Sequence, residues 1–203
     1  YAVLIFAMWW IMMAAMMVPS VAPMVLLFSA VSRKETEGEA AVAPTGAFLL
    51  GYLLVWGAFS ALTTGLQWLL ERSGLVSPMG METGLALGGG LLVAAGLYQL
   101  TPLKQACLAK CRNPLLFLMQ EWRPSNRGAL RMGAAHGAWC LGCCWFLMAL
   151  LFVGGVMNVL WIAGLAVYVY IEKLAPYGHW LSYATGLPLT LAGIGIWICA
   201  LAP

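Results

Sequence analysis

Three cysteines and a histidine lie close together between positions 133 and 144. The run reads Gly133-Ala-Ala-His136-Gly137-Ala-Trp-Cys140-Leu-Gly-Cys143-Cys144. At 3.6 residues per turn, the imidazole and the three thiols fall within an arc of roughly 100° on one helix. Small residues four apart, here Gly133 and Gly137, let a second backbone approach closely in lipid. We therefore expect this stripe to be buried against a neighbouring helix.

A second pair of thiols, Cys107 and Cys111, is spaced four residues apart between Pro102 and Pro114. This spacing predicts a short interfacial or re-entrant helix near 103–113, with both thiols on one face. Thiols and imidazole together are the ligand set of Cu(I), or alternatively Zn(II). The predicted metal ligands are Cys107, Cys111, His136, Cys140, Cys143 and Cys144. The first four are expected nearest the ion, with the last two forming a deeper position.

Two other interpretations of the thiols stay open. Cysteine packs well as a small buried residue, and Cys199, alone near the end of the chain, fits that description. Thiol redox chemistry is the other, although a reducing cytoplasm and a position inside a span both disfavour it.

Six methionines open the chain, at positions 8, 12, 13, 16, 17 and 24. Thioethers bind Cu(I), but methionine also fills irregular gaps, and these six spread over about half of a helix circumference. Packing and ion handling are both open for them. Pro19 and Pro23 are expected to kink or break this helix.

Glu172 adjoins Lys173 at the end of an apolar stretch. A carboxylate at membrane depth usually faces a partner or a water-filled cavity. We expect either a structural bond to a loop arginine or a role in proton or cation handling. Gln99 is expected to form a hydrogen bond between helices.

Composition sets the class of protein. The chain has 203 residues, of which 63% are hydrophobic and only 8% charged, and it contains no Asp. A soluble domain carries about 25% charged residues, so this chain is expected to be an integral membrane protein. It has no glycine-rich phosphate loop, no paired carboxylates and no Ser/His/Asp set, so an enzyme is not favoured.

The fold predicted is an all-α polytopic helix bundle forming a single transmembrane domain over 1–203. Six stretches are long and apolar enough to span a bilayer: about 3–31, 47–70, 84–103, 130–152, 155–173 and 182–201. Lys and Arg crowd alternate loops, which predicts a cytoplasmic loop at 103–128 in a bacterial-type inner (plasma) membrane. The chain starts without Met, so a further span upstream is expected.

The motifs resemble the predicted metal-binding integral membrane proteins known as domain of unknown function 2182. The resemblance covers most of the chain in the same order and rests on these segments: Met12-Met13-Ala-Ala-Met16-Met17-Val-Pro19-Ser20, Gly51-Tyr52 with Trp56, Tyr98-Gln99-Leu-Thr-Pro102-Leu-Lys104-Gln-Ala-Cys107-Leu with Cys111-Arg112, His136-Gly137 through Cys140-Leu-Gly-Cys143-Cys144-Trp145, and Met157-Asn158 with Glu172-Lys173. It implies a polytopic membrane protein that binds a metal.

We therefore predict a membrane protein that binds Cu(I) through the Cys/His cluster, for metal handling or delivery. An accessory subunit of a larger membrane oxidoreductase or pigment-protein complex is the alternative, and transport is a third. The expected partners are the lipid bilayer and subunits of such a complex, with no nucleic acid.

Overall fold

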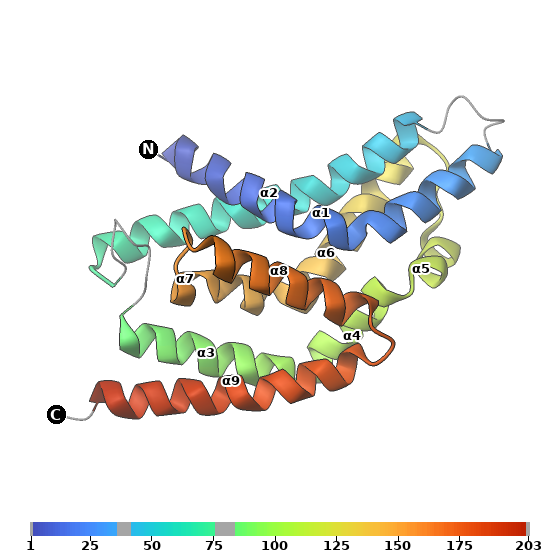
Figure 1. Cartoon of the computed structure of the whole chain (residues 1–203). Coiled ribbons are helices and arrows are strands. Elements are labelled where there is room, and N and C mark those ends of the chain that lie inside the picture. Colours follow the sequence, from blue (N-terminus) through green and yellow to red (C-terminus); the bar gives the residue numbers. More distant parts are fainter. Residues whose placement is uncertain (1, 36–41, 76–83, 202–203) are drawn as a thin grey trace. The chain divides into compact units, whose positions relative to one another are not determined.

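The computed structural model describes residues 2–35, 42–75 and 84–201, and every regular element in them is a helix (Figure 1). The order is α1 (Ala2–Glu35), α2 (Val42–Arg72), α3 (Leu85–Gln99), α4 (Pro102–Arg112), α5 (Pro114–Glu121), α6 (Asn126–Ala149), α7 (Leu151–Gly154), α8 (Val159–Leu174) and α9 (Gly178–Leu201). The prediction of an all-α fold is confirmed, as is the short helix near 103–113.

The described residues include four helices that are long and apolar enough to cross a membrane: Ala2–Lys34, Val42–Arg72, Asn126–Gly154 and Gly178–Ala200. A fifth arises if α3 and α4, which meet at an angle of 65°, are counted as one broken span. The six predicted spans are therefore not confirmed. Two of the predicted spans correspond to helices that are too short: α3 has 15 residues and α8 has 16. At 1.5 Å per residue both are shorter than the hydrocarbon layer, which is about 30 Å thick.

The chain divides into two compact units, Tyr1–Thr64 with Ala106–Cys143 and Gly65–Gln105 with Cys144–Pro203. We call them unit 1 and unit 2 and describe each by itself. The predicted single transmembrane domain stays a prediction.

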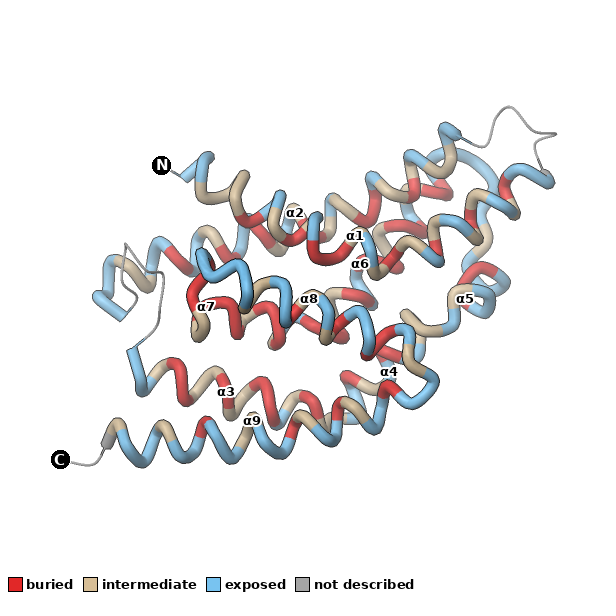
Figure 2. Tube along the Cα trace, in the orientation of Figure 1, coloured by how far each residue is buried: buried red, intermediate tan, exposed pale blue. Residues whose placement is uncertain are grey.

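In unit 1, α1 buries one continuous stripe of large apolar side chains, which Figure 2 shows in red along the helix. The stripe comprises Trp9, Met13, Met16, Met17, Val21, Met24 and Phe28. These positions recur every three or four residues, which is the spacing of one helix face. The helix runs through Pro19 and Pro23 without ending, and Figure 1 shows it changing direction about midway. The prolines therefore bend this helix and do not break it.

Glycines bring α2 and α6 of unit 1 into close contact. A Cβ at Gly133 would overlap the backbone carbonyl of Phe48, and one at Gly51 would overlap that of Leu130. The predicted close approach at Gly133 is thus present, and the neighbouring helix is α2. Side chains of α2, such as those of Phe48 and Tyr52, therefore lie next to the Cys/His stripe of α6.

Unit 2 is built in the same way around α3 and α9, which lie side by side (Figure 1). Gly89 meets the backbone of Gly193, and Gly96 meets the backbone of Gly186 and Thr190. Each helix thus carries two glycines seven positions apart on the same face. Because these positions have no side chain, the two backbones approach closely over two turns. Gly155, at a φ of 84°, turns the chain from α7 toward α8, and Asn158 caps α8 by accepting a hydrogen bond from the Trp161 backbone N–H.

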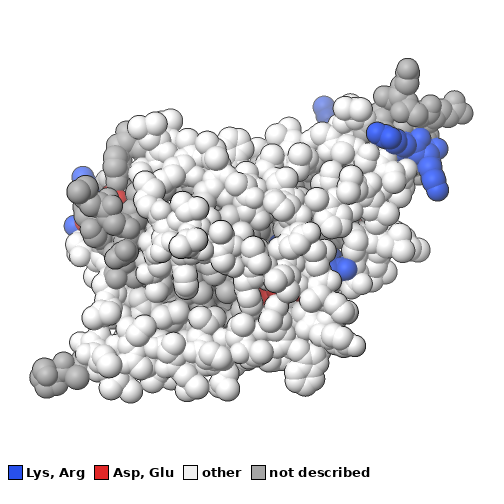
Figure 3. All heavy atoms as spheres, viewed as in Figure 1, with Lys and Arg blue, Asp and Glu red and all other residues white. Residues whose placement is uncertain are grey.

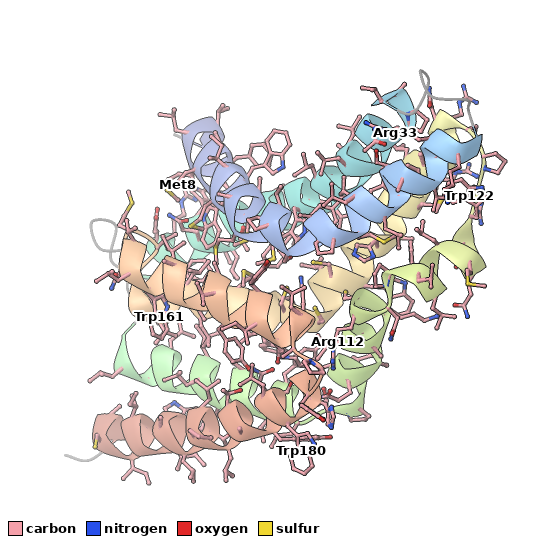
Figure 4. The ribbon with its side chains drawn as sticks, turned by 45° about the vertical axis from the view of Figure 1, so that its right-hand side comes forward. Met8, Arg33, Arg112, Trp122, Trp161 and Trp180 are labelled. Atoms are coloured by element: carbon pink, nitrogen blue, oxygen red, sulfur yellow. The ribbon has the colours of Figure 1, made fainter. Side chains whose placement is uncertain are left out.

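Charge in unit 1 gathers at helix ends. Arg33 and Lys34 lie in the last turn of α1, and Lys110 and Arg112 lie in the last turn of α4. Figure 3 shows the cations at the end of α1 beside a surface that is otherwise almost uncharged, and Figure 4 labels Arg33 and Arg112. Basic side chains at this position interact favourably with the negative end of the helix dipole.

Candidate metal centre

The thiol stripe of α6 is buried as predicted. Cys140, Cys143 and Cys144 are each 1% exposed and His136 is 4% exposed. Cys143 donates a hydrogen bond from Sγ to the backbone carbonyl of Cys140, 3.0 Å away. This bond sets the direction of the Cys143 side chain along the helix. Cys144 follows on the same helix and belongs to unit 2.

Helix α4 brings the loop thiols to α6. Cys107, which is 6% exposed, packs where α6 has no side chain, since a Cβ at Gly142 would lie 2.8 Å from its Sγ. Cys111 is half-buried, and its thiol lies close enough to those of Cys140 and Cys143 to interact with both. Cys107 interacts electrostatically with Cys143. Four of the six predicted residues, two from each helix, therefore meet within unit 1.

Tyr52 of α2 also contacts the thiols, and the sequence-based site did not include it. Its hydroxyl lies 3.1 Å from Sγ of Cys140 and donates to the Met17 backbone carbonyl over 3.3 Å. The side chain is fully buried. One phenol thus connects the methionine stripe of α1 with the thiol stripe of α6.

His136 lies one helical turn before Cys140 and is surrounded by aromatic rings. The ring centroid of Phe117 lies 5.2 Å away, that of Phe48 6.2 Å and that of Tyr52 6.3 Å. Phe48 and Tyr52 come from α2 and Phe117 from α5. The imidazole is therefore held in an apolar wall next to the thiols.

The thiols meet as pairs and do not form a closed cage. No group of three or more His, Cys, Asp or Glu side chains in the described ranges is arranged to hold a metal ion. A structural Zn(II) site takes four ligands in a tetrahedron. Cu(I) accepts fewer soft ligands, and two thiolates on opposite sides suffice for it.

Unit 2 contains a second buried polar cluster. Nζ of Lys104 lies 2.7 Å from Oε1 of Glu172, and both side chains are fully buried. The carboxylate therefore pairs with a lysine of α4, and the expectation of a loop arginine was wrong. Gln99 donates to the Tyr168 hydroxyl over 2.9 Å, which confirms the predicted hydrogen bond between helices.

The fold and the site define an all-helical, thiol-rich protein with long apolar helices. A family model described as a copper chaperone, PpoB2, matches residues 6–196. Since the match covers nearly the whole chain, the chain belongs to this family, and copper handling agrees with the expectation from the sequence. No curated protein and no solved structure is similar enough to be matched.

Proposed function

We propose that this protein is a membrane-embedded copper chaperone that carries Cu(I) between thiolates of α4 and α6 in unit 1. The observation that carries the proposal is the proximity of the thiols of α4 to those of α6: Cys107 packs against α6 at Gly142, and Cys111 lies within interaction distance of Cys140 and Cys143. Thiolates are the ligands that select Cu(I), and membership of a copper chaperone family supports copper as the cargo.

Cys111 with Cys140 or Cys143 forms the entry pair. Cys111 is half-buried whereas the α6 thiols are almost fully buried, so these side chains lead from the surface of the unit to its interior. An ion that arrives at Cys111 exchanges one thiolate for another as it moves inward. Cys107 and His136 adjoin this pair and supply further ligands along the path. Such stepwise ligand exchange suits delivery of the ion, because the ion never has to leave a site in which ligands surround it on all sides.

The meeting of thiols in pairs also favours Cu(I) over Zn(II). Zn(II) in proteins is almost always four-coordinate, with Cys, His or carboxylate ligands. The described part of the chain has no such convergent set.

The buried methionines of α1 provide the next ligands for the cargo. Thioethers bind Cu(I) without being deprotonated, so they accept it in an apolar interior. Tyr52 connects the backbone at Met17 with Cys140, which places the two stripes on either side of a single phenol. In this proposal the ion passes from the thiolates to these methionines as copper is handed on.

A membrane location completes the proposal. Four of the described helices are long and apolar enough to cross a bilayer, and their outward residues include many large apolar side chains, among them Leu26, Leu62 and Ile198. Such side chains are stable in lipid and costly in water. The cations at the ends of α1 and α4 are expected on the cytoplasmic side.

The experiment is an anaerobic competition titration of the purified full chain with a chromophoric Cu(I) chelator. Cys111→Ser and Cys140→Ser should each weaken Cu(I) binding by at least about tenfold, or ~1.4 kcal/mol. Cys199→Ser is the matched control, because this exposed thiol lies on the last helix and outside unit 1. Equal affinities for all four proteins would contradict the proposal.

A further inference from the structure

Unit 2 contains an open apolar cavity that the copper site does not use. Its volume is about 410 Å³, and its walls are α8, α9 and the end of α6, with Trp161 of α8, which Figure 4 labels, among the lining residues. Most of the wall consists of leucine, alanine and proline side chains, such as Leu165, Leu189 and Pro188. Sites for small molecules in proteins have volumes of about 300–1,000 Å³ and are lined mainly by apolar side chains. The cavity therefore has the size and the lining of a binding site for an apolar ligand.

The polar side chains in the wall are already hydrogen-bonded within unit 2. Nε1 of Trp161 donates to the backbone carbonyl of Leu150, 2.9 Å away. The Tyr168 hydroxyl lies 2.6 Å from Oγ1 of Thr185, and Gln99 donates to these two oxygens over 2.9 Å and 3.3 Å. A polar ligand would thus lose its own hydrogen bonds to water without gaining side-chain partners here. The wall favours a ligand that has no polar groups in its enclosed part.

Water is a poor occupant of this cavity. An ordered water in a protein makes about three hydrogen bonds, and cavities lined by leucine and similar side chains stay dry. A gap without any occupant is also unfavourable, because the side chains around it have no partner atoms for dispersion contacts. Hydrocarbon supplies those contacts and asks for no hydrogen bonds.

The cavity lies at the depth of the bilayer centre if α9 spans the membrane. The candidate span is Gly178–Ala200, and only 11% of its apolar window is buried inside the protein. At 1.5 Å per residue, Pro188 lies about 15 Å from the first residue of this span and about 18 Å from the last. Helix α9 contains no Lys, Arg, Asp or Glu. The molecules next to the cavity at that depth are the acyl chains of lipids.

The size of the cavity distinguishes a single hydrocarbon chain from a further helix. A helix is 10–12 Å across and rises 5.4 Å per turn, so that one turn fills roughly 500 Å³. The cavity is smaller than one such turn. At roughly 30 Å³ for a group the size of a water molecule, it holds on the order of a dozen methylene groups. Leu187 and Leu191, which are 59% and 60% exposed, continue the apolar surface of α9 beside it.

We propose that this cavity binds one acyl chain of a membrane lipid. The chain lies between α8 and α9 with its methylene groups against Leu165, Pro188 and Leu189, and its head group stays outside the cavity. Lipid tails are as apolar as leucine, so the gain on binding comes from dispersion contacts, and no covalent bond forms or breaks. The inference rests on the proposed membrane location and is independent of the copper site.

The test is photolabelling of the metal-free full chain in phosphatidylcholine vesicles. A small fraction of the lipid carries a photoactivatable diazirine near the middle of one acyl chain, and peptide mass spectrometry locates the adducts. Leu165 is only 8% exposed, whereas Leu187 is 59% exposed, so lipid that merely surrounds the protein labels Leu187 more strongly. A chain bound in the cavity should label Leu165 and Leu189 more strongly than Leu187. The same lipid with its diazirine in the head group should leave Leu165 and Leu189 unlabelled.

Two matched substitutions on α9 sharpen the test. Ala192→Phe places a ring in the cavity and should reduce the labelling of Leu165 about tenfold, which corresponds to ~1.4 kcal/mol of binding free energy. Leu187→Phe changes an outward side chain of the same helix and should leave that labelling unchanged. Equal labelling of Leu165 in the unsubstituted protein and in folded Ala192→Phe would overturn the proposal.

The unsubstituted protein alone also decides the question, so the result does not depend on the folding of Ala192→Phe. Labelling of Leu165 and Leu189 that is no stronger than that of Leu187 would overturn the proposal, because another part of the protein then fills the cavity. Alkaline extraction of the same vesicles separates the two proposals. A chain that alkali removes from the vesicles contradicts the membrane location as well, whereas an inserted chain without adducts in the cavity contradicts only the lipid site.

Discussion

The hydroxyl of Tyr52 lies 3.1 Å from Sγ of Cys140 and also reaches the backbone carbonyl of Met17. This contact places a hydrogen-bonding group directly on one of the thiols proposed to carry copper. A metal ligand that is oriented by such a partner binds more tightly, since the partner fixes the side chain before the ion arrives. The Tyr52 hydroxyl of α2 thereby connects α1 with α6.

Tyr52→Phe tests this contact. We expect the Kd for Cu(I) to rise about tenfold, because partners that orient a metal ligand typically contribute that much. The free energy of unfolding should fall by only about 0.5–1.5 kcal/mol, the net value of one hydrogen bond. The Met17 carbonyl keeps its bond from Ser20 Oγ at 2.8 Å, so no new buried acceptor is orphaned. Tyr183→Phe on the exposed face of α9 serves as the control in both the chelator titration and the unfolding experiment.

Gly142→Ala should act on the copper site through α4. The new Cβ would lie 2.8 Å from Sγ of Cys107, which is closer than real Cβ contacts allow. We expect Cys107 and its helix to shift away from α6 and Cu(I) affinity to fall by roughly tenfold, ~1.4 kcal/mol. Gly164→Ala in α8 is the matched control, since nothing lies within 4 Å of its Cβ position. A change of equal size in both variants would show that the effect does not come from Cys107.

Gly133→Ala should destabilise unit 1. The added methyl group meets the backbone carbonyl of Phe48, which has no freedom to rotate away. Overpacking of this kind costs about 1–3 kcal/mol, and here the two helices must separate. Gly164→Ala is expected to be neutral or to stabilise by up to about 1 kcal/mol, because alanine is the better helix former. Unfolding in mixed micelles measures both, and equal stabilities would refute the close contact of α2 with α6.

The energetic coupling between Lys104 and Glu172 can be measured with a double-mutant cycle. Lys104→Met alone leaves Glu172 without its cation and should cost about 3–5 kcal/mol of folding stability, the usual loss when one partner of a buried ion pair is removed. Combining it with Glu172→Gln should restore a large part of the loss, since both charges are then gone. Additive effects of the two substitutions would mean that the charges are not coupled.

The sequence predicted the helices and faces that carry the candidate thiols better than the contacts between those helices. Helical spacing alone placed His136, Cys140, Cys143 and Cys144 on one side of a helix, and the structure buries all four. The short helix carrying Cys107 and Cys111 was predicted from its flanking prolines and is α4. That these two helices would meet rested on the predicted topology, and local patterns carry no information about such long-range contacts.

What the sequence did not reveal depends on tertiary packing. Tyr52 looks like one aromatic residue among many in an apolar helix, and only the close approach at Gly51 and Gly133 places it at Cys140. The six methionines were judged too dispersed for one stripe, yet four of them share the buried face of α1. Glu172 was expected either to bond to a loop arginine or to handle protons or cations, and the structure pairs it with Lys104 of α4.

X-ray absorption at the copper edge of the Cu(I)-loaded full chain tests the central claim most directly. The account predicts a low-coordinate site with two or three sulfur neighbours at thiolate distances, and the loss of one sulfur from the first shell in Cys111→Ser. A first shell of nitrogen and oxygen, or a spectrum unchanged when Cys111, Cys140 and Cys143 are all replaced by serine, would contradict it.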